Sequence, residues 1–497
     1  MTTGATEAEH TVQLTARFVI GHDGADHVVY DHGVVVYRGD TILFCGQEYR
    51  DPVDETLDLG LSIISPGFID LDADVDTDHA LIDVAFPRDP RDAFRMGARF
   101  RTVDPYTDED LRVRQTYSLA QLLKNGITTA MPIEGELFHG WSQSYREFEI
   151  MADVALNLGC RLYVGPSFKS SPGPGMAVDA RRSAQSWSDA LAFVEQFDGQ
   201  GHGLLRGFMN PCQINCTSEE LLLRASAFAQ ARGMPMRLHA CEGLHEWELI
   251  RSKGGESTIA YFEELGLLSP RLLIPHCLVA RDRELRLLAE RGVSVIHTPI
   301  AEINFGAALV SFAKYQHYGI NIAMGTDAQP DDMIQNMRLA WNLDRQFHRR
   351  EIYNVYPDRG PAYNLLAGQA EYPRLTGADV FRAATTNGAK ALGRDDLGRL
   401  SRGAKADIIV IGLDDLAVGP YEDPIRTLIM SCVGNNVTHT IVNGKMLMRD
   451  RHLLGIDERA LLCRAQEVYE RFLHLYQAYD EQQRPIETFF PPEFRRV

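Results

Sequence analysis

The chain has 497 residues, which is too long for one small core but suits an α/β barrel with an accessory sheet. Its formal net charge of -18 argues against a nucleic-acid backbone or an anionic membrane surface as a partner, so a small neutral or cationic molecule is the expected ligand. Its eight cysteines contain no CxxC pair, which argues against a zinc ribbon and a disulfide framework.

The first residues, MTTGATEAEHTVQ, lack the basic start and the apolar core of a signal peptide. No apolar run further along the chain is long enough to span a bilayer. We therefore expect a cytoplasmic protein.

Two β segments at opposite ends of the chain are expected to form one small domain. VVVYRGDTILFCG alternates apolar runs around a Gly-Asp turn, which is typical of a β-hairpin. ADIIVIGL and HTIVNGKMLM repeat this pattern near the end, with Asn443-Gly444 as a turn. We predict a β-sandwich domain built from residues 1–62 and 393–452.

Residues 453–497 are predicted to form a C-terminal helix and tail, because apolar residues recur at helical spacing in LLCRAQEVYERFLHLYQAYDEQ. The apolar tail FFPPEF must dock either on its own barrel or on a second subunit, and we expect a homo-oligomer.

The middle of the chain, residues 63–392, alternates short buried strands with amphipathic helices. Helical stretches such as SEELLLRASAFAQARG and RELRLLAERG each end at a glycine. This pattern predicts a parallel (β/α)8 barrel of the TIM type, whose active site lies at the C-terminal ends of the strands. The expected strands are SIISPGFID, GITTAMPI, RLYVGPSF, LLRGFMN, MPMRLHA, RLLIPHCL, VSVIHTPI and NIAMGTDA.

Histidines and acidic residues stand at four of these strand ends. Imidazole suits divalent transition metals, and a nearby carboxylate can pass a proton from metal-bound water to a leaving group. The sequence therefore predicts a catalytic metal site. Its candidates are Asp72 and Asp74 on the first strand, His239 and Glu242 on the fifth, His276 on the sixth and Asp327 on the eighth.

The chain resembles the amidohydrolase superfamily, in the branch of guanine and cytosine-type deaminases and triazine hydrolases. The motifs that carry the resemblance cover nearly the whole chain in order: PGFID, NGITTA, HACE, PHC, GTDA, ATTNGAKALG and GRLSRGAKADIIV. The resemblance implies that His239 and Asp327 bind a metal ion. It also implies that Asp327 can accept a proton from the attacking water and that Glu242 shuttles protons.

By the same resemblance, His276 either binds the metal or polarises the water and the substrate. Binuclear members of the superfamily bridge two metals with a carboxylated lysine on the fourth strand, and LLRGFMN contains no lysine. We therefore expect one divalent ion.

The first strand departs from the superfamily pattern, because Asp72 and Asp74 occupy the places of a His-x-His pair. A subgroup that includes phenylurea hydrolases and molinate hydrolase also departs from this pattern, and DLDADVDTDHALI is similar to it. Together with Asp327, three carboxylates would converge, and a cation or bound protons must compensate them. A metal compensates them most economically.

An oxygen-rich site shifts metal preference toward manganese, iron or cobalt, with zinc still possible. In an alternative arrangement, His239, His276 and Asp327 are the ligands, and Asp72 or Asp74 lies behind them. An EF-hand calcium loop does not fit, because no register of the acidic run places glycine sixth and glutamate twelfth.

Phe138, His139 and Trp141 follow the second strand, and they are expected either to wall the substrate pocket or to pack ordinarily. The leading functional hypothesis is a metal-dependent hydrolase that cleaves an amide, urea or carbamate C–N bond of a small neutral molecule with metal-activated water. One alternative is a deaminase or dechlorinase of a purine, pyrimidine or triazine. The other is a barrel that has lost catalysis and binds a ligand or partner.

Overall fold

The computed structural model describes most of the chain, with gaps at the N-terminus, after the first barrel strand and in several loops. The described residues are 10–75, 106–133, 141, 144–173, 176–304, 306–309, 311–327, 330–349, 351–356, 360–365 and 372–479, with 484–485, 487, 492 and 494–495 of the tail.

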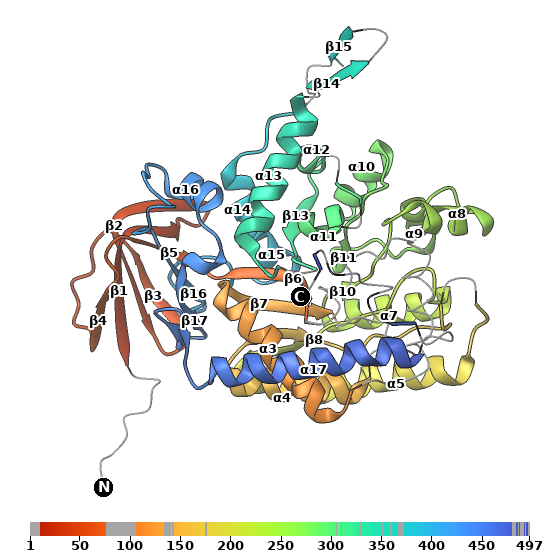
Figure 1. Ribbon diagram of the computed structural model, residues 1–497, viewed down its shortest axis with the longest axis horizontal. Helices are drawn as coiled ribbons and strands as arrows, with labels where there is room; N and C mark the ends of the chain where they lie inside the picture. The colour runs from red at the N-terminus through yellow and green to blue at the C-terminus, as the bar shows by residue number, and fades with distance from the viewer. Residues whose placement is uncertain are drawn as a thin grey trace.

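Strands from both ends of the chain form one nine-stranded sheet, which lies at the left of Figure 1. Its strands are β1 (Thr11–His22), β2 (His27–Arg38), β3 (Thr41–Gly46), β4 (Glu55–Asp58), β5 (Ser62–Pro66), β16 (Ile408–Gly412), β17 (Val437–Val442), β18 (Lys445–Arg449) and β19 (His452–Leu453). The two halves meet where β5 runs antiparallel to β16, with Pro66 opposite Ile408. Both predicted hairpins, β2–β3 and β17–β18, are confirmed.

The terminal sheet has its own apolar core because its strands alternate inward apolar residues with outward polar ones. Leu14, Val35, Ile64, Ile408 and Ile441 are fully buried members of this cluster. The β-sandwich description and the domain boundaries stay predictions.

Seven of the eight strands expected in the middle of the chain are present in their expected places, whereas the first, SIISPGFID, is split at Gly67 between β5 of the terminal sheet and β6 (Phe68–Asp74). Strand β6 and the other seven strands form two four-stranded parallel sheets. One sheet contains β6, β7 (Ile127–Ile133), β8 (Arg161–Val164) and β9 (Leu205–Gly207). The other contains β10 (Met236–Arg237), β11 (Leu272–Pro275), β12 (Ser294–His297) and β13 (Asn321–Met324).

The two parallel sheets are linked at both of their outer edges. On one side Met209, just after β9, forms a parallel bridge with Met236 of β10. On the other side the amide of Asp327, just after β13, donates a hydrogen bond to the carbonyl of Asp72 in β6. Strand ends from the beginning and the end of the middle region therefore lie together.

Helices connect these strands, and local signals explain their limits. Both helices expected from the sequence are confirmed, as α7 (Glu219–Arg232) and α10 (Asp282–Glu290). Helix α7 begins after Ser218, whose hydroxyl accepts from the amide of Leu221, and it ends at Gly233, which has a left-handed φ of 65°.

The other helices of the middle region are α3 (Asp108–Lys124), α4 (Tyr145–Leu158), α5 (Ala180–Phe197), α6 (Gln200–Gly203), α8 (Leu244–Ser252), α9 (Thr258–Leu265), α11 (Pro299–Asn304), α12 (Phe312–His317), α13 (Met333–Arg349), α14 (Gly377–Ala383) and α15 (Thr386–Ala391). The hairpin of β14 (Glu351–Tyr356) and β15 (Gly360–Leu365) projects beyond the end of α13 (Figure 1). Helix α16 (Pro424–Ser431) and the 3-10 turn η3 (Gly434–Asn436) precede β17.

The predicted C-terminal helix is confirmed as α17 (Glu458–Tyr479), which runs along α3 (Figure 1). Lys124 at the end of α3 lies 2.6 Å from the Glu458 carboxylate, and the rings of Tyr106 and Phe472 stack with centroids 5.6 Å apart. Helix α17 therefore docks on the chain's own middle region.

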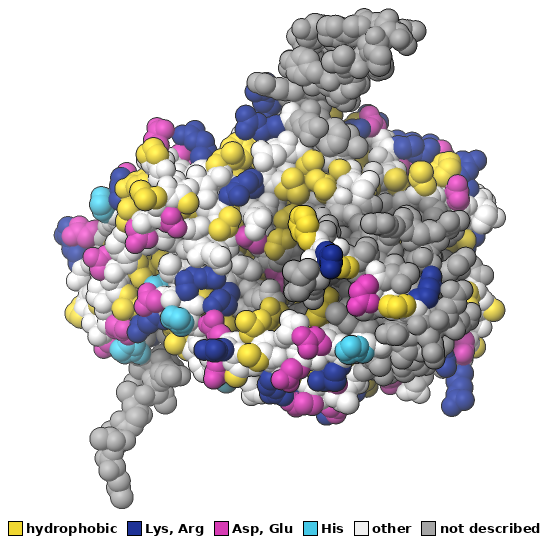
Figure 2. Space-filling view, in the orientation of Figure 1, with side chains coloured by type: hydrophobic (Ala, Val, Ile, Leu, Met, Phe, Trp, Pro, Cys, Tyr) yellow, Lys and Arg dark blue, Asp and Glu magenta, His cyan; other side chains and the backbone are white. Residues whose placement is uncertain are grey.

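Acidic and basic side chains are interspersed over the face in Figure 2, with no broad patch of one sign among the residues coloured there. Within the described ranges, no helix has the length and apolar character needed to cross a membrane.

Candidate metal centre

Three of the predicted site residues come together at the ends of three strands. Asp72, His239 and His276 each offer one ligand atom, and these atoms lie within 4.8 Å of one another. All three residues are buried. The two histidines are neighbours because Ala240 forms a parallel bridge with His276. One carboxylate oxygen and two imidazole nitrogens form a donor set that suits zinc and related divalent ions.

Asp327 lies beside this group but is not part of it. Its Oδ2 atom is 3.8 Å from Nε2 of His276. The approach of its segment to Asp72 needs a glycine at position 325, because a Cβ there would lie 2.8 Å from Cβ of Asp72. The glycine of the GTDA motif is thus explained by a close contact within the site.

The backbone is strained at the mouth of the strands. Cys241, His276, Cys277 and Asp327 all have positive φ values, of 60°, 61°, 52° and 58°. Such conformations cost about 1–3 kcal/mol each outside glycine, and they persist where the surrounding structure enforces them, often at functional sites. The strain therefore marks this strand edge as a candidate active site.

His276 is held from behind by the turn after β12. Its Nδ1 atom is 2.9 Å from Oγ1 of Thr298 and 3.8 Å from a carboxylate oxygen of Glu302. Although burial lowers the pKa of His276, Glu302 and Asp327 together raise it to about 10. Glu302 also accepts hydrogen bonds from the amides of Thr298 and Leu309.

Glu302 is a residue that sequence reasoning missed. It is fully buried between two histidines, with His297 Nδ1 3.1 Å from its Oε1 atom. Burial alone raises the pKa of Glu302, but His297 and His276 hold it well below its usual range. The only signal in the sequence is a glutamate five positions after a histidine in HTPIAE.

Arg237 was also missed, and it lies against Asp72. The guanidinium Nη1 is 3.0 Å from Asp72 Oδ1, and His239 Nε2 is 3.4 Å from Asp72 Oδ2. Although burial raises the pKa of Asp72, His239 and Arg237 hold it below its usual range. An arginine two positions before His239 in the buried strand MPMRLHA was the available signal.

The state of the Asp72 carboxylate supports a bound cation. Both of its oxygen atoms are buried, and neither has a hydrogen-bond partner among the residues that the structure describes. Buried carboxylate oxygens are normally hydrogen-bonded, paired or bound to metal. A divalent ion would satisfy the free lone pairs of Asp72, so these residues fit a metal ion.

Asp70 shares a face of β6 with Asp72 in the sequence pattern, but its carboxylate is already used. Thr326 donates to it from both its hydroxyl, at 2.6 Å, and its amide, at 3.1 Å. Burial raises the pKa of Asp70 to about 7. Asp70 therefore ties β6 to the segment that carries Asp327.

Glu242 is exposed next to the site, in the loop after β10. The buried carboxylate of Glu246 fixes this loop by accepting from the amides of Cys241 and Glu242. Burial raises the pKa of Asp327, and Asp72 and Glu242 raise it further. The role of Glu242 as a proton shuttle stays a prediction.

The predicted pocket wall is only partly described. Phe138, His139 and the Asp74 side chain lie outside the described residues, although the backbone of Asp74 ends β6. Trp141 donates from its indole to Ser186 Oγ of α5, and Lys169 Nζ lies 5.7 Å from the ring centre. Trp141 therefore packs on α5, and its contact with substrate stays a prediction.

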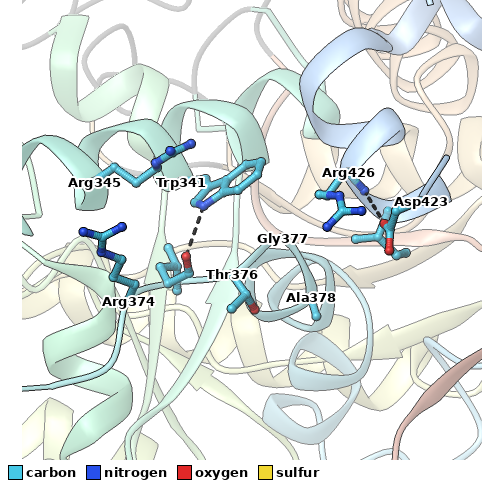
Figure 3. A pocket seen from close by; sticks show the side chains of 10 residues that line it. Trp341, Arg345, Arg374, Thr376, Gly377, Ala378, Asp423 and Arg426 are labelled. Atoms are coloured by element: carbon cyan, nitrogen blue, oxygen red, sulfur yellow. Dashed lines mark hydrogen bonds between the residues drawn. The ribbon is translucent and has the colours of Figure 1, made fainter. Parts of the chain in front are cut away.

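A separate hollow of about 470 Å³ lies between α13, α14 and α16, as Figure 3 shows. Trp341 forms part of its wall, and its indole donates to the carbonyl of Leu375. Arg345, Arg374 and Arg426 line the same hollow from exposed positions. None of the predicted site residues whose side chains are described lines it.

The sequence comparisons agree with the motifs at the strand ends. The model of the Amidohydrolase family matches residues 63–447. A 5-methylthioadenosine/S-adenosylhomocysteine deaminase of Syntrophobacter fumaroxidans is 28% identical over 68% of this chain and 70% of its own length. The enzyme of that name from Halobacterium salinarum is 26% identical over 88% of this chain and 91% of its own length.

Solved structures share the fold. An adenosine deaminase from Xanthomonas campestris with bound zinc has a TM-score of 0.76 at 21% identity, and 93% of this chain and 98% of that one are covered. A variant of atrazine chlorohydrolase from Arthrobacter aurescens, complexed with zinc and atraton, has a TM-score of 0.77 at 20% identity, with 92% and 100% covered. The likeness implies an α/β TIM-barrel fold for this chain.

Proposed function

The chain belongs to the amidohydrolase family, whose enzymes act on carbon–nitrogen bonds other than peptide bonds, and we propose that it hydrolyses an amide, urea or carbamate bond of a small neutral molecule. The observation that carries this proposal is the convergence of Asp72, His239 and His276 within 4.8 Å. A divalent ion bound there would supply a Lewis acid and lower the pKa of a water molecule.

In the proposed reaction, water adds to an sp² carbon that carries nitrogen, and the C–N bond then breaks. Asp327 accepts a proton from the attacking water, since its carboxylate lies 3.8 Å from His276 and burial raises its pKa. Glu242 shuttles this proton to the departing nitrogen, which leaves as a neutral amine, while the hydroxyl of the water stays on the carbon. His276, whose Nδ1 is held by Thr298, would serve as a metal ligand together with Asp72 and His239.

A second candidate is deamination or dechlorination of a nitrogen heterocycle. The names of the similar proteins favour it, because they include methylthioadenosine, deoxyadenosine and guanine deaminases and a triazine hydrolase. The departure of Asp72 and Asp74 from a His-x-His pair favours the acyclic substrates, through the resemblance to phenylurea and molinate hydrolases. On the same ground we propose a role in xenobiotic degradation.

A substrate panel separates the two candidates. Zinc-loaded protein is incubated with anilides, phenylureas and thiocarbamates, and in parallel with aminopurine nucleosides and chloro- or aminotriazines. Release of amine, ammonia or chloride is measured, with Asp327→Asn as the control for background hydrolysis. We expect turnover of the acyclic compounds. Turnover confined to the ring compounds would select the second candidate, and no turnover by the metal-loaded protein would favour a binding function.

A further inference from the structure

Asp72, a member of the candidate metal-binding group, forms a fully buried ion pair with Arg237. The Nη1 atom of Arg237 is 3.0 Å from Oδ1 of Asp72, and both side chains are 0% exposed. Arg237 precedes His239 by two residues at the end of β10. Because alternate residues of a strand share a face, the guanidinium lies one layer below the imidazole.

The guanidinium is fixed by backbone carbonyls and not by Asp72. Its Nη1 donates to the carbonyls of Met131, at 2.8 Å, and Leu71, at 3.3 Å. Its Nη2 donates to the carbonyl of Pro132 at 2.8 Å. The Asp72 oxygens accept no hydrogen bond from the described residues. Arg237 therefore acts on Asp72 through its charge and leaves the lone pairs of the carboxylate free.

This arrangement answers the charge problem that the sequence poses. Replacing a neutral imidazole by a carboxylate adds one negative charge to a buried site, and a buried charge needs a partner. From the sequence, a metal ion was the expected partner for the acidic cluster. In the structure Arg237 supplies a positive charge to Asp72, so the pair is formally neutral, as a histidine is.

We propose that Arg237 is a positioning residue that serves as the fixed counter-charge of Asp72, so that the pair acts as a single neutral metal ligand. The inference rests on the metal site of the proposed function, but its test needs no substrate. One consequence is that the net charge of the site resembles that of a histidine-rich site. The site then has no excess of carboxylate charge that would favour harder ions over zinc.

A double-mutant cycle tests this role, with Arg237→Met, Asp72→Asn and the double variant. The melting temperature of the metal-free protein and its zinc affinity, by competition with a chromogenic chelator, are measured for each. With Asp72 present, Arg237→Met should lower the melting temperature by at least about 5 °C, because it leaves a buried carboxylate without its partner. When Asp72 is replaced by Asn, Arg237→Met should lower the melting temperature by less than about half of the loss seen with Asp72 present.

Zinc affinity provides the readout that a merely structural arginine would not move. In Asp72→Asn the Arg237 cation is no longer neutralised and repels the metal. Removing the cation in the double variant should tighten zinc binding by about tenfold or more relative to Asp72→Asn. Equal melting losses in both backgrounds, with zinc binding unchanged or weakened in the double variant, would overturn the proposal.

Arg161 provides the matched control, because it is a second buried arginine in an ion pair, with Asp407 at 2.8 Å. It begins β8 and so lies at the opposite ends of the strands. Arg161→Met should lower the melting temperature equally with Asp72 or Asn at position 72 and leave zinc affinity unchanged. If the effect of Arg161→Met on the melting temperature depended on residue 72 as strongly as the effect of Arg237→Met does, the specific role of Arg237 would be contradicted.

If Arg237→Met does not fold, Arg237→Lys carries the test, because it keeps the charge and loses the planar fork. It should keep zinc affinity within about threefold of the parent, while Asp72→Asn, with Arg237 intact, loses about tenfold or more. Equal zinc affinities in these two variants would overturn the proposal. If the parent protein binds no zinc, both the metal site and the proposed function are rejected. If the parent binds zinc but the effects of the Arg237 and Asp72 substitutions simply add, only the role of Arg237 is rejected.

Discussion

The backbone amide of Asp327 donates a hydrogen bond to the carbonyl oxygen of Asp72, with 2.6 Å between nitrogen and oxygen. This bond joins the last barrel strand to the first and sets an acidic residue from each beside His276. The contact is close because position 325 is glycine, as a Cβ there would also lie 3.0 Å from a Thr298 methyl.

Gly325→Ala is therefore expected to displace Asp72 or Thr298. Overpacking of this kind lowers the free energy of unfolding by about 1–3 kcal/mol. The zinc affinity of Gly325→Ala should fall as well, because Asp72 is displaced. Calorimetry and zinc competition measure the two effects. Gly243→Ala is the control, since its Cβ would meet nothing within 4 Å. Unchanged zinc affinity in Gly325→Ala would show that this contact does not set the geometry of the site.

Glu302→Gln should impair catalysis without unfolding the protein. The substitution keeps the shape of the side chain but removes the charge that raises the pKa of His276. Loss of a residue that orients a metal-site histidine typically costs 10–100-fold, so we expect kcat/KM to fall by about that factor. The comparison is Glu290→Gln, an exposed glutamate on α10. Parental kinetics for Glu302→Gln would exclude a positioning role.

The ion pair between Arg161 and Asp407 should anchor the terminal sheet to the barrel. The two side chains are 1% and 4% exposed, and Asp407 also accepts from the amide of Asn443. Arg161→Met leaves a buried carboxylate unpaired, which costs about 3–5 kcal/mol of unfolding free energy. Urea denaturation measures this loss.

The exposed pair of Arg146 and Asp108 is the control for that experiment, because its side chains are 50% and 62% exposed. Arg146→Met should leave the urea midpoint unchanged, since solvent screens such pairs. Similar losses in the two variants would mean that burial does not decide the strength of these pairs.

His27 should make the protein less stable in mild acid. Burial lowers its pKa to about 4, and its Nε2 lies 3.1 Å from Thr385 Oγ1. Because the folded pKa is below the unfolded value of 6.5, the unfolded chain binds more protons between pH 6.5 and 4. Stability is then full above pH 6.5 and falls by up to about 3 kcal/mol as the pH drops to 4.

His27→Gln removes this titration and keeps a polar group near Thr385. The difference in unfolding free energy between parent and variant should therefore shrink on going from pH 7.5 to pH 4.5. Parallel stability profiles for the two proteins would refute the assignment to His27.

Much of the fold was predictable because its signals are local. Seven of the eight expected strands and the hairpin at Asn443-Gly444 follow from apolar runs and turn residues, and the structure has them in those places. The first expected strand is divided at Gly67, because its apolar first half pairs with β1 and β16 of the terminal sheet. The grouping of Asp72, His239 and His276 followed from one rule, that parallel strands bring their carboxyl ends together.

The supporting residues were not predictable because their partners come from other strands. Arg237 contacts Asp72 across 165 positions of sequence and donates its hydrogen bonds to carbonyls of β6 and β7. Glu302 meets His276 only through the turn after β12.

The most direct test of the central claim is the metal content of purified parent, Asp72→Ala and His239→Ala proteins, measured by elemental analysis after zinc loading and desalting. We expect about one zinc per chain in the parent and a loss of most of it in both variants, with turnover abolished by chelation and restored by zinc. A parent without stoichiometric metal, or full metal content in both variants, would contradict it.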